Sequence, residues 1–147
     1  MGKNKANRLL AVVIGIITVI GLIAAVRADN ATRQLDRSTP EGTVQAYLTS
    51  VVAGDYESAV KHIAPASSCT VTDLDNSYFA KDVRISLVDS HTTSSGGVVK
   101  INVEVPSGGP IGSYYSEEHT IRLVKGNQGW RITGIPWPMY ACGTANQ

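Results

Sequence analysis

Glu117 and His119 are the two residues whose types and spacing best suit acid/base chemistry. They lie two positions apart in a stretch, 113–124, whose alternating pattern predicts a long β-strand. Residues two apart on a strand share a face, so a carboxylate and an imidazole are expected side by side. A single β-bulge would invert the pattern and leave the pair in water at an edge. The residues predicted on this face are Tyr115, Glu117, His119, Ile121 and Leu123.

The other motifs offer less chemistry. His62 lies between two apolar residues of a short predicted helix, so it is interpreted as a surface or rim residue, and His91 falls in a polar stretch. No serine, histidine and aspartate fall in a nucleophile-elbow motif. The sequence also has no phosphate-binding loop and no dinucleotide fingerprint, so no cofactor is expected.

These residues belong to a chain that is expected to begin with a membrane anchor, the apolar run Leu9–Val26. The run has no charged residue, and as a helix it would extend roughly 27 Å, close to the ~30 Å hydrocarbon core of a bilayer. A basic leader, residues 1–8, precedes it, and a polar stalk, residues 27–38, follows it. The leader predicts a cytoplasmic N-terminus, which puts residues 39–147, one domain by length, outside the cytoplasm.

Cleavage is the alternative fate of the apolar run. Val26-Arg27-Ala28 offers small residues ahead of Asp29, as a secretory signal requires. The run exceeds the ~7–15 residues of a usual signal core, however, and Arg27 lies inside the cleavage site. A retained single-pass anchor is therefore favoured over a secreted domain, and both fates export the C-terminal part.

The charge distribution argues against a nucleic-acid partner. Residues 1–37 carry six Lys/Arg against two Asp/Glu, whereas residues 38–147 carry seven against ten. The exported part is therefore mildly acidic and has no basic run, while binding to phosphate backbones needs clustered cations.

Cys69 and Cys142 are the only cysteines of the chain. Outside the cytoplasm an even pair predicts a disulfide, and closing so long a loop would contribute roughly 4–5 kcal/mol. Two free thiols are the alternative. Because two isolated cysteines do not supply the closely spaced ligands of a metal site, no metal is expected.

Helical signals open the exported domain. Ser38 with Glu41 fits a capping box, while Thr39 with Pro40 fits a cap followed by a first-turn proline. Gly54 is expected to end this first helix. Its predicted apolar stripe comprises Val44, Tyr47, Leu48, Val51 and Val52.

A second, shorter helix is expected from its cap Asp55 to about residue 64, where Pro65 stops it, and Thr72–Phe79 is expected to add one helical turn. After Asp82 the period changes to two, which predicts strands near 83–87, 99–105, 113–124 and 130–135. A polar turn at 91–97, a Gly/Pro/Ser loop at 106–112 and a hairpin turn at 125–129 would separate them. Two to three helices packed on a curved antiparallel sheet of about four strands make an α+β domain.

The C-terminal tail offers a candidate contact surface. Trp137, Met139 and Tyr140 form an apolar group near Cys142. The structural interpretation is that the tail folds back and these side chains cover the open end of the core; the functional one is that they hold a partner. Tyr114 and Tyr115, beside the glycine loop, form a second candidate surface.

The order of these elements resembles the nuclear transport factor two-like, or cystatin-like, cone. The resemblance rests on Thr39-Pro40-Glu41-Gly42 at the first helix, Gly54-Asp55-Tyr56 between the helices and Gly129-Trp130-Arg131-Ile132 in the last strand. It covers residues 39–142, and the chain is similar to small, membrane-anchored, actinobacterial-type proteins of that fold. The resemblance implies a cone-shaped domain that in some members pairs as a dimer.

Two functions follow from this resemblance as expectations. The first is a non-catalytic binding or accessory module of the cell envelope, held by Leu9–Val26 in the bilayer, with an envelope protein or a second copy as partner. The second is a small-molecule binder or isomerase-like enzyme that uses the cone cavity, because enzymes of this fold keep a carboxylate or histidine base inside it. In that case Glu117 and His119 would be the weak catalytic candidates. A fold alone does not choose between them.

Overall fold

The computed structural model describes residues 33–78, 82–107 and 112–142. The chain divides into two units, Met1–Arg33 and Gln34–Gln147, and the second is described below. The predicted anchor Leu9–Val26, its leader and the first half of the stalk, residues 27–32, lie outside the described residues. Within the described ranges, no helix combines the length and the apolar character needed to cross a membrane.

Short helical segments open the domain. They are α2 (Pro40–Val52), α3 (Tyr56–Val60), the 3₁₀ helix η1 (Pro65–Ser67) and α4 (Val71–Asp75). Thr39, not Ser38, caps α2, since its side chain accepts a hydrogen bond from Gly42 N at 3.1 Å. Gly54 follows α2 with φ +74°, a left-handed conformation that favours glycine, so the predicted end of the helix is confirmed.

Gly42, in the first turn of α2, lies directly against the loop that precedes the helix. A Cβ at this position would overlap the carbonyl oxygen of Asp36. Replacing glycine by alanine inside a helix normally stabilises it by about 1 kcal/mol. Gly42→Ala is instead expected to lower the free energy of unfolding by about 1–3 kcal/mol, because the loop must move. Urea denaturation measures this, with Thr49→Ala, an exposed position of α2, as a control expected within about 0.5 kcal/mol of wild type. A stabilised Gly42→Ala protein would contradict the packing.

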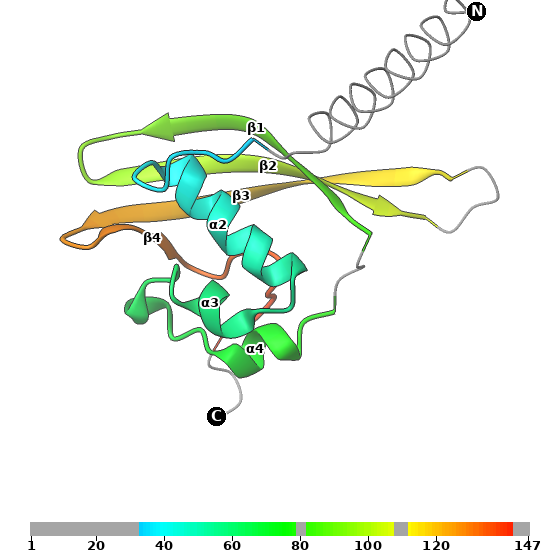
Figure 1. Ribbon diagram of the computed structural model, residues 1–147, viewed down its shortest axis with the longest axis horizontal. Coiled ribbons are helices and arrows are strands. Elements are labelled where there is room, and N and C mark those ends of the chain that lie inside the picture. The colour runs from blue at the N-terminus through cyan, green and yellow to red at the C-terminus, as the bar shows by residue number, and fades with distance from the viewer. Residues whose placement is uncertain (1–32, 79–81, 108–111, 143–147) are drawn as a thin grey trace, which may run out of the picture. The chain divides into compact units, whose positions relative to one another are not determined.

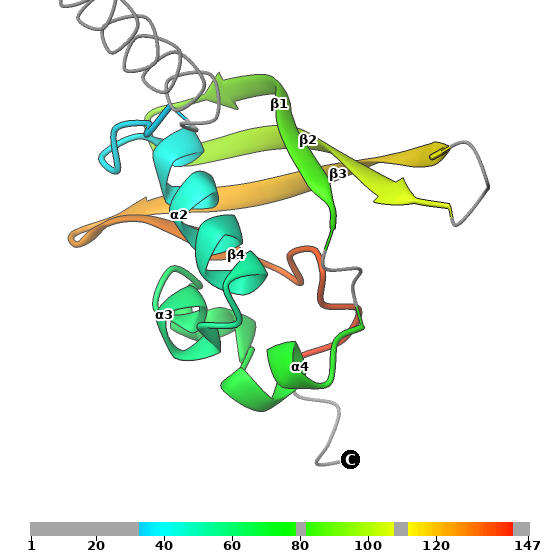
Figure 2. The same ribbon diagram turned by 45° about the vertical axis from the view of Figure 1, so that its right-hand side comes forward.

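Four strands form one antiparallel sheet in the order β1-β2-β3-β4. They are β1 (Arg84–Thr92), β2 (Gly96–Pro106), β3 (Tyr114–Gly126) and β4 (Gly129–Thr133). The sheet is curved, and α2 lies across one of its faces (Figure 1). The fold is therefore α+β, as the sequence predicts. β1 and β4 are shorter than the two central strands. The end of the β2–β3 hairpin where Pro106 pairs with Tyr114 therefore extends beyond both of them (Figures 1 and 2).

Two features of β1 differ from the prediction. His91 was expected in a turn spanning 91–97, but it pairs with Val98, and β1 runs on to Thr92. The turn is shortened to residues 93–95 because Thr93 closes it: its N–H donates to Gly96 O at 2.8 Å, and its hydroxyl accepts from Gly96 N at 3.1 Å. In addition, a bulge between Leu87 and Asp89 shifts the register, and Leu87, expected on the buried face, is 50% exposed.

The second helix is also shorter than predicted, and it ends at Val60. The reason lies in β4, where Ile63 forms a parallel bridge with Ile132. Ile132 N–H donates to His62 O at 2.9 Å, and Ala64 N–H donates to Ile132 O at 2.7 Å. These hydrogen bonds to a distant strand replace the ones that would continue the helix. The spacing of apolar residues within the segment therefore predicts a helix that is too long. The additional helical turn expected at Thr72–Phe79 is α4, which begins and ends earlier.

The core fills the space between the helices and the covered face of the sheet. From α2 it takes Val44, Tyr47, Leu48 and Val51, as predicted, whereas Val52 is 47% exposed. The rings of Pro40 and Trp130 both pack closely against Gly97. A side chain at position 97 would meet both rings, so the glycine leaves room for them. The sheet contributes Val99, Ile101, Val103, Ile121, Leu123, Trp130 and Ile132, and the remaining core residues are Ala59, Ile63, Leu74, Trp137 and Met139.

Candidate functional site

The core-facing side of β3 carries the predicted acid/base pair. The β2–β3 register runs without a shift, and it sets Val103 opposite Glu117 and Ile101 opposite His119. Because directly paired residues share a face, both side chains lie on the same face as the buried core of β2. The bulge that would have inverted this strand is absent from β3 as described and occurs in β1 instead.

Glu117 and His119 contact each other at the outer end of this face. His119 Nε2 lies 3.1 Å from Glu117 Oε2, and the side chains are 26% and 43% exposed respectively. Since an ionised carboxylate only accepts hydrogen bonds, the imidazole donates through Nε2. A carboxylate that orients an imidazole in this way could support proton transfer. Both groups remain accessible to water, however, because the buried core ends beside them.

The tail packs against this pair. The Trp137 ring lies 5.8 Å from the His119 ring, centre to centre, at a tilt of 41°. Trp137 and Met139 are 7% and 4% exposed, so they belong to the core, whereas Tyr140 is 76% exposed. The tail thus folds back over the core, as its structural interpretation predicts. Of the three tail residues considered for partner binding, Tyr140 is the one that presents its side chain to solvent.

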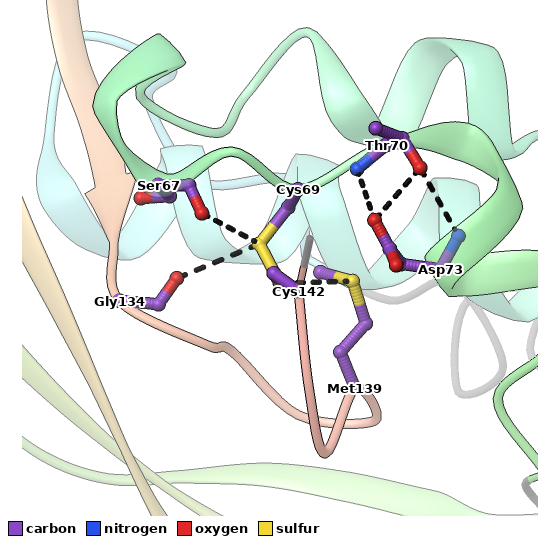
Figure 3. Close-up of a disulfide and its surroundings, with 7 residues drawn as sticks. All are labelled: Ser67, Cys69, Thr70, Asp73, Gly134, Met139 and Cys142. Carbon is purple, nitrogen blue, oxygen red and sulfur yellow. Dashed lines mark hydrogen bonds between the residues drawn. A yellow bond between two sulfur atoms is a disulfide. The ribbon is translucent and has the colours of Figure 1, made fainter. Parts of the chain in front are cut away.

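The Cys69–Cys142 disulfide holds the tail in place (Figure 3). It joins residues 73 positions apart in the sequence and confirms the predicted pairing. Cys69 Sγ lies 3.6 Å from Ser67 O and 3.7 Å from Gly134 O, contacts that are polar only, because a disulfide sulfur carries no hydrogen. Cys142 Sγ lies 3.8 Å from Met139 Sδ. The disulfide therefore ties the tail to the segment between η1 and α4.

The helix after Cys69 is itself well anchored. Thr70 and Asp73 form a reciprocal capping box at the start of α4: Asp73 Oδ2 accepts from Thr70 N at 2.7 Å, and Thr70 Oγ1 accepts from Asp73 N at 3.3 Å. The two side chains also bond each other at 2.7 Å (Figure 3). One end of the disulfide is consequently fixed by local structure, while the other end closes the tail.

Tyr114 and Tyr115 point to opposite faces of the β2–β3 hairpin, because they are successive residues of β3. They are 46% and 49% exposed. Tyr115 lies opposite Val105, on the face of Glu117, whereas Tyr114 lies opposite Pro106 on the other face. Arg84 covers the Tyr114 ring at 5.0 Å in a cation–π contact. The two tyrosines therefore do not form one surface, and Tyr115 extends the surface of the acid/base pair.

His62 is a residue whose environment the sequence did not reveal. It was interpreted as a rim residue, and it is half-buried between the end of α3 and β4. Burial lowers the pKa of its imidazole below the usual value of 6.5, and the positive charges of Arg131 and Arg37 lower that pKa further. No signal in the local sequence identifies these neighbours, because both arginines are distant along the chain.

The lowered pKa of His62 predicts a pH dependence of stability. Between the usual pKa of 6.5 and the lower pKa of the folded state, the unfolded chain binds more protons than the native chain. The free energy of unfolding is therefore expected to fall as the pH drops below about 6.5, and to level off below the folded pKa. Urea denaturation at a series of pH values measures the fall. His62→Gln should reduce this fall in stability, whereas His91→Gln, at an exposed position, should leave it unchanged. An equal dependence of stability on pH in wild type and in His62→Gln would contradict the assignment of the fall to His62.

No cluster of three or more His, Cys, Asp or Glu suited to a metal ion occurs in residues 33–78, 82–107 and 112–142. What the domain offers at this site is a solvent-facing polar pair, an exposed tyrosine and a packed tryptophan, on the open end of a four-stranded antiparallel sheet.

Comparison with known proteins adds little beyond the arrangement of elements. No protein-family model matches the sequence, and no curated protein matches it. A SEC-C motif-containing protein from Rhodopseudomonas palustris is similar in structure, with 16% identity and a TM-score of 0.49 over 67% of this chain and 78% of that one.

Two further solved structures have TM-scores of 0.45. One is a Campylobacter jejuni protein named as an NTF2-like transpeptidase, with 12% identity over 65% of this chain and 97% of that one. The other is a Mycobacterium tuberculosis protein of unknown function, with 15% identity over 64% of this chain and 65% of that one. Likeness at this level assigns neither a family nor an activity.

Proposed function

We propose that this chain is a membrane-anchored, extracytoplasmic, non-catalytic binding module of the cell envelope. The observation that carries the proposal is the exposure of Glu117 and His119, paired with each other at the open end of the sheet. A base that works inside a cone is effective in a site that excludes water. A partly exposed carboxylate and imidazole that pair with each other beside Tyr115 suit contact with a partner better than removal of a substrate's proton.

The proposed location rests on two features of the chain. The Cys69–Cys142 disulfide suits an oxidising compartment, since cytosolic thiols are kept reduced. Leu9–Val26 would hold the domain to the bilayer as a single-pass anchor, with a cytoplasmic N-terminus and an extracellular domain. Secretion after cleavage before Asp29 is the alternative. We also propose that the domain is of the nuclear transport factor two-like type found in membrane-anchored actinobacterial proteins.

The proposed binding surface comprises Tyr115, Glu117 and His119. Tyrosine is enriched where proteins meet, because it combines a large apolar ring with a polar group. Leu87, which is 50% exposed, lies on the same side, since it pairs with Ile101, which in turn pairs with His119. The partner expected is an envelope protein or a second copy of this chain.

Site-specific photo-cross-linking tests the surface. A benzophenone amino acid at position 115 is expected to give a discrete cross-linked product in intact cells, which mass spectrometry identifies. The same amino acid at position 114 is the matched control, because Tyr114 is equally exposed but lies on the opposite face. No product from position 115, or the same product from both positions, would overturn the proposed surface.

A second candidate function is small-molecule binding with isomerase-like proton transfer. It is favoured by one observation, the 3.1 Å contact through which Glu117 orients the His119 ring. Wild type would then turn over a substrate with an acidic C–H bond, while His119→Ala and Glu117→Gln would lose about 10²–10⁴-fold in rate. Absence of turnover in wild type over a panel of such substrates would exclude this candidate.

A further inference from the structure

The C-terminal tail, residues 134–142, connects the disulfide to the proposed binding surface. Trp137 and Met139 are buried in the core, and Cys142, three residues after Met139, is bonded to Cys69. Within the tail, Met139 N–H donates to Pro136 O at 2.9 Å. Buried side chains and the disulfide thus both hold the tail against the domain.

Consecutive contacts lead from the disulfide to the acid/base pair. Cys142 Sγ lies 3.8 Å from Met139 Sδ (Figure 3). Trp137, two residues before Met139, lies against His119, with their ring centres 5.8 Å apart. His119 Nε2 in turn contacts Glu117 Oε2 at 3.1 Å. The state of the disulfide can therefore reach the surrounding of the imidazole through two residues of the tail.

The two ends of the disulfide are held unequally. Cys69 directly precedes α4, whose capping box of Thr70 and Asp73 fixes the local backbone. Cys142 follows the exposed residues Tyr140 and Ala141 at the end of the described chain. Elsewhere in the domain, α2 packs directly on β2 and β4. Breaking the bond is therefore expected to release the tail locally and to leave the sheet and its helix in place.

We propose that the Cys69–Cys142 disulfide is a redox switch for the proposed binding surface. In the oxidised chain, Trp137 packs on the His119 ring and restricts its orientation, so the imidazole is preorganised for the partner. In the reduced chain the tail leaves, and binding must then order the ring. That cost weakens binding about three- to tenfold. The inference rests on the proposed function, because it concerns the regulation of the same surface.

Thiol–disulfide exchange with an external dithiol operates the switch. A thiolate of the dithiol attacks one sulfur of the Cys69–Cys142 bond and forms a mixed disulfide, while the other sulfur leaves as a thiolate and takes up a proton. The second thiol of the reductant then displaces the protein from the mixed disulfide. Two electrons pass to the protein, which gains two thiols, and the dithiol becomes a disulfide. The reverse exchange with the oxidised reductant restores the bond.

Nuclear magnetic resonance of the full chain in a non-ionic detergent tests the effect on His119. An indole shifts the resonances of the protons that lie against it, so the ring protons of His119 report the presence of Trp137. Reduction with dithiothreitol should move the His119 resonances toward those of a free histidine. The rings of His62 and His91 and the indole N–H of Trp130, which is 6% exposed in the core, should stay in place and report an intact fold.

Two variants separate positioning from general stability. Trp137→Leu, with the bond intact, should give the reduced-like His119 resonances, and dithiothreitol should then change them no further. Cys69→Ala with Cys142→Ala should give the same resonances without reductant. Unchanged His119 resonances on reduction of wild type would overturn the switch. So would the simultaneous loss of the folded signals of His62, His91 and Trp130, because the bond would then serve the whole fold.

Photo-cross-linking from position 115 distinguishes the switch from the function on which it rests. The yield of cross-linked product per chain in the membrane fraction should fall about three- to tenfold when both cysteines are replaced with alanine. Equal yields with and without the cysteines would overturn the switch and leave the proposed function standing. No product in wild type would instead overturn the proposed function.

Discussion

Replacing both cysteines, Cys69 and Cys142, with alanine is expected to lower the free energy of unfolding by about 4 kcal/mol. The bond closes a loop of 73 residues, and the loss of chain entropy in the unfolded state grows with the length of the loop. This is a large share of the ~5–15 kcal/mol that stabilises an ordinary domain. Without the disulfide, the C-terminal tail should also detach from the core. Trp137 and Met139 are buried while the tail is folded back, so their side chains should then become exposed.

Urea denaturation followed by tryptophan fluorescence measures both effects. Wild type treated with a reductant is the matched control, because it has the native side chains without the bond. The free energy of unfolding of the reduced wild type should fall by nearly the same amount as that of the double variant. A loss below about 1 kcal/mol in both would mean that packing alone holds the tail, and that the disulfide contributes little to the fold.

Two substitutions of Tyr47 are expected to act in opposite directions. Tyr47→Ala should lower the free energy of unfolding by about 3–5 kcal/mol, since the ring is 0% exposed at the centre of the core. Tyr47→Phe should raise it by about 1 kcal/mol. The reason is that the Tyr47 hydroxyl is buried, and within the described part of the chain it has no hydrogen-bond partner. Its burial also raises the pKa of that hydroxyl well above the usual value of 10.

Thermal and urea denaturation of the two Tyr47 variants give the sign directly. Tyr56→Phe is the control, because Tyr56 packs at the margin of the core and is only half-buried, so a change within about 0.5 kcal/mol is expected. A Tyr47→Phe protein less stable than wild type by more than 1 kcal/mol would show that the hydroxyl is satisfied in solution.

Local signals in the sequence predict most of the elements. The threonine and proline at residues 39–40 set the start of α2, and Gly54 sets its end, because capping and left-handed backbone depend on a few adjacent residues. The alternation in β2 and β3 likewise predicts which side chains are buried. It places Glu117 and His119 on the core-facing side, since a strand without a bulge keeps its parity.

What the sequence could not predict depends on distant contacts. The early end of α3 reflects hydrogen bonds between residues 62–64 and Ile132, and the half-burial of His62 follows from the same pairing. The bulge between Leu87 and Asp89 has no marker in the local pattern. The packing of Trp137 on His119 also requires the folded-back tail, which the disulfide implies but does not specify in detail.

The proposed function requires one physical arrangement, a disulfide-bonded domain held outside the cytoplasm by Leu9–Val26. Fractionation of cells that make the full chain, followed by alkylation of thiols before and after reduction, tests it most directly. We expect the protein in the carbonate-resistant membrane fraction, with Cys69 and Cys142 labelled only after reduction. Recovery of the protein from the soluble cytosol, with both thiols labelled before reduction, would contradict the account.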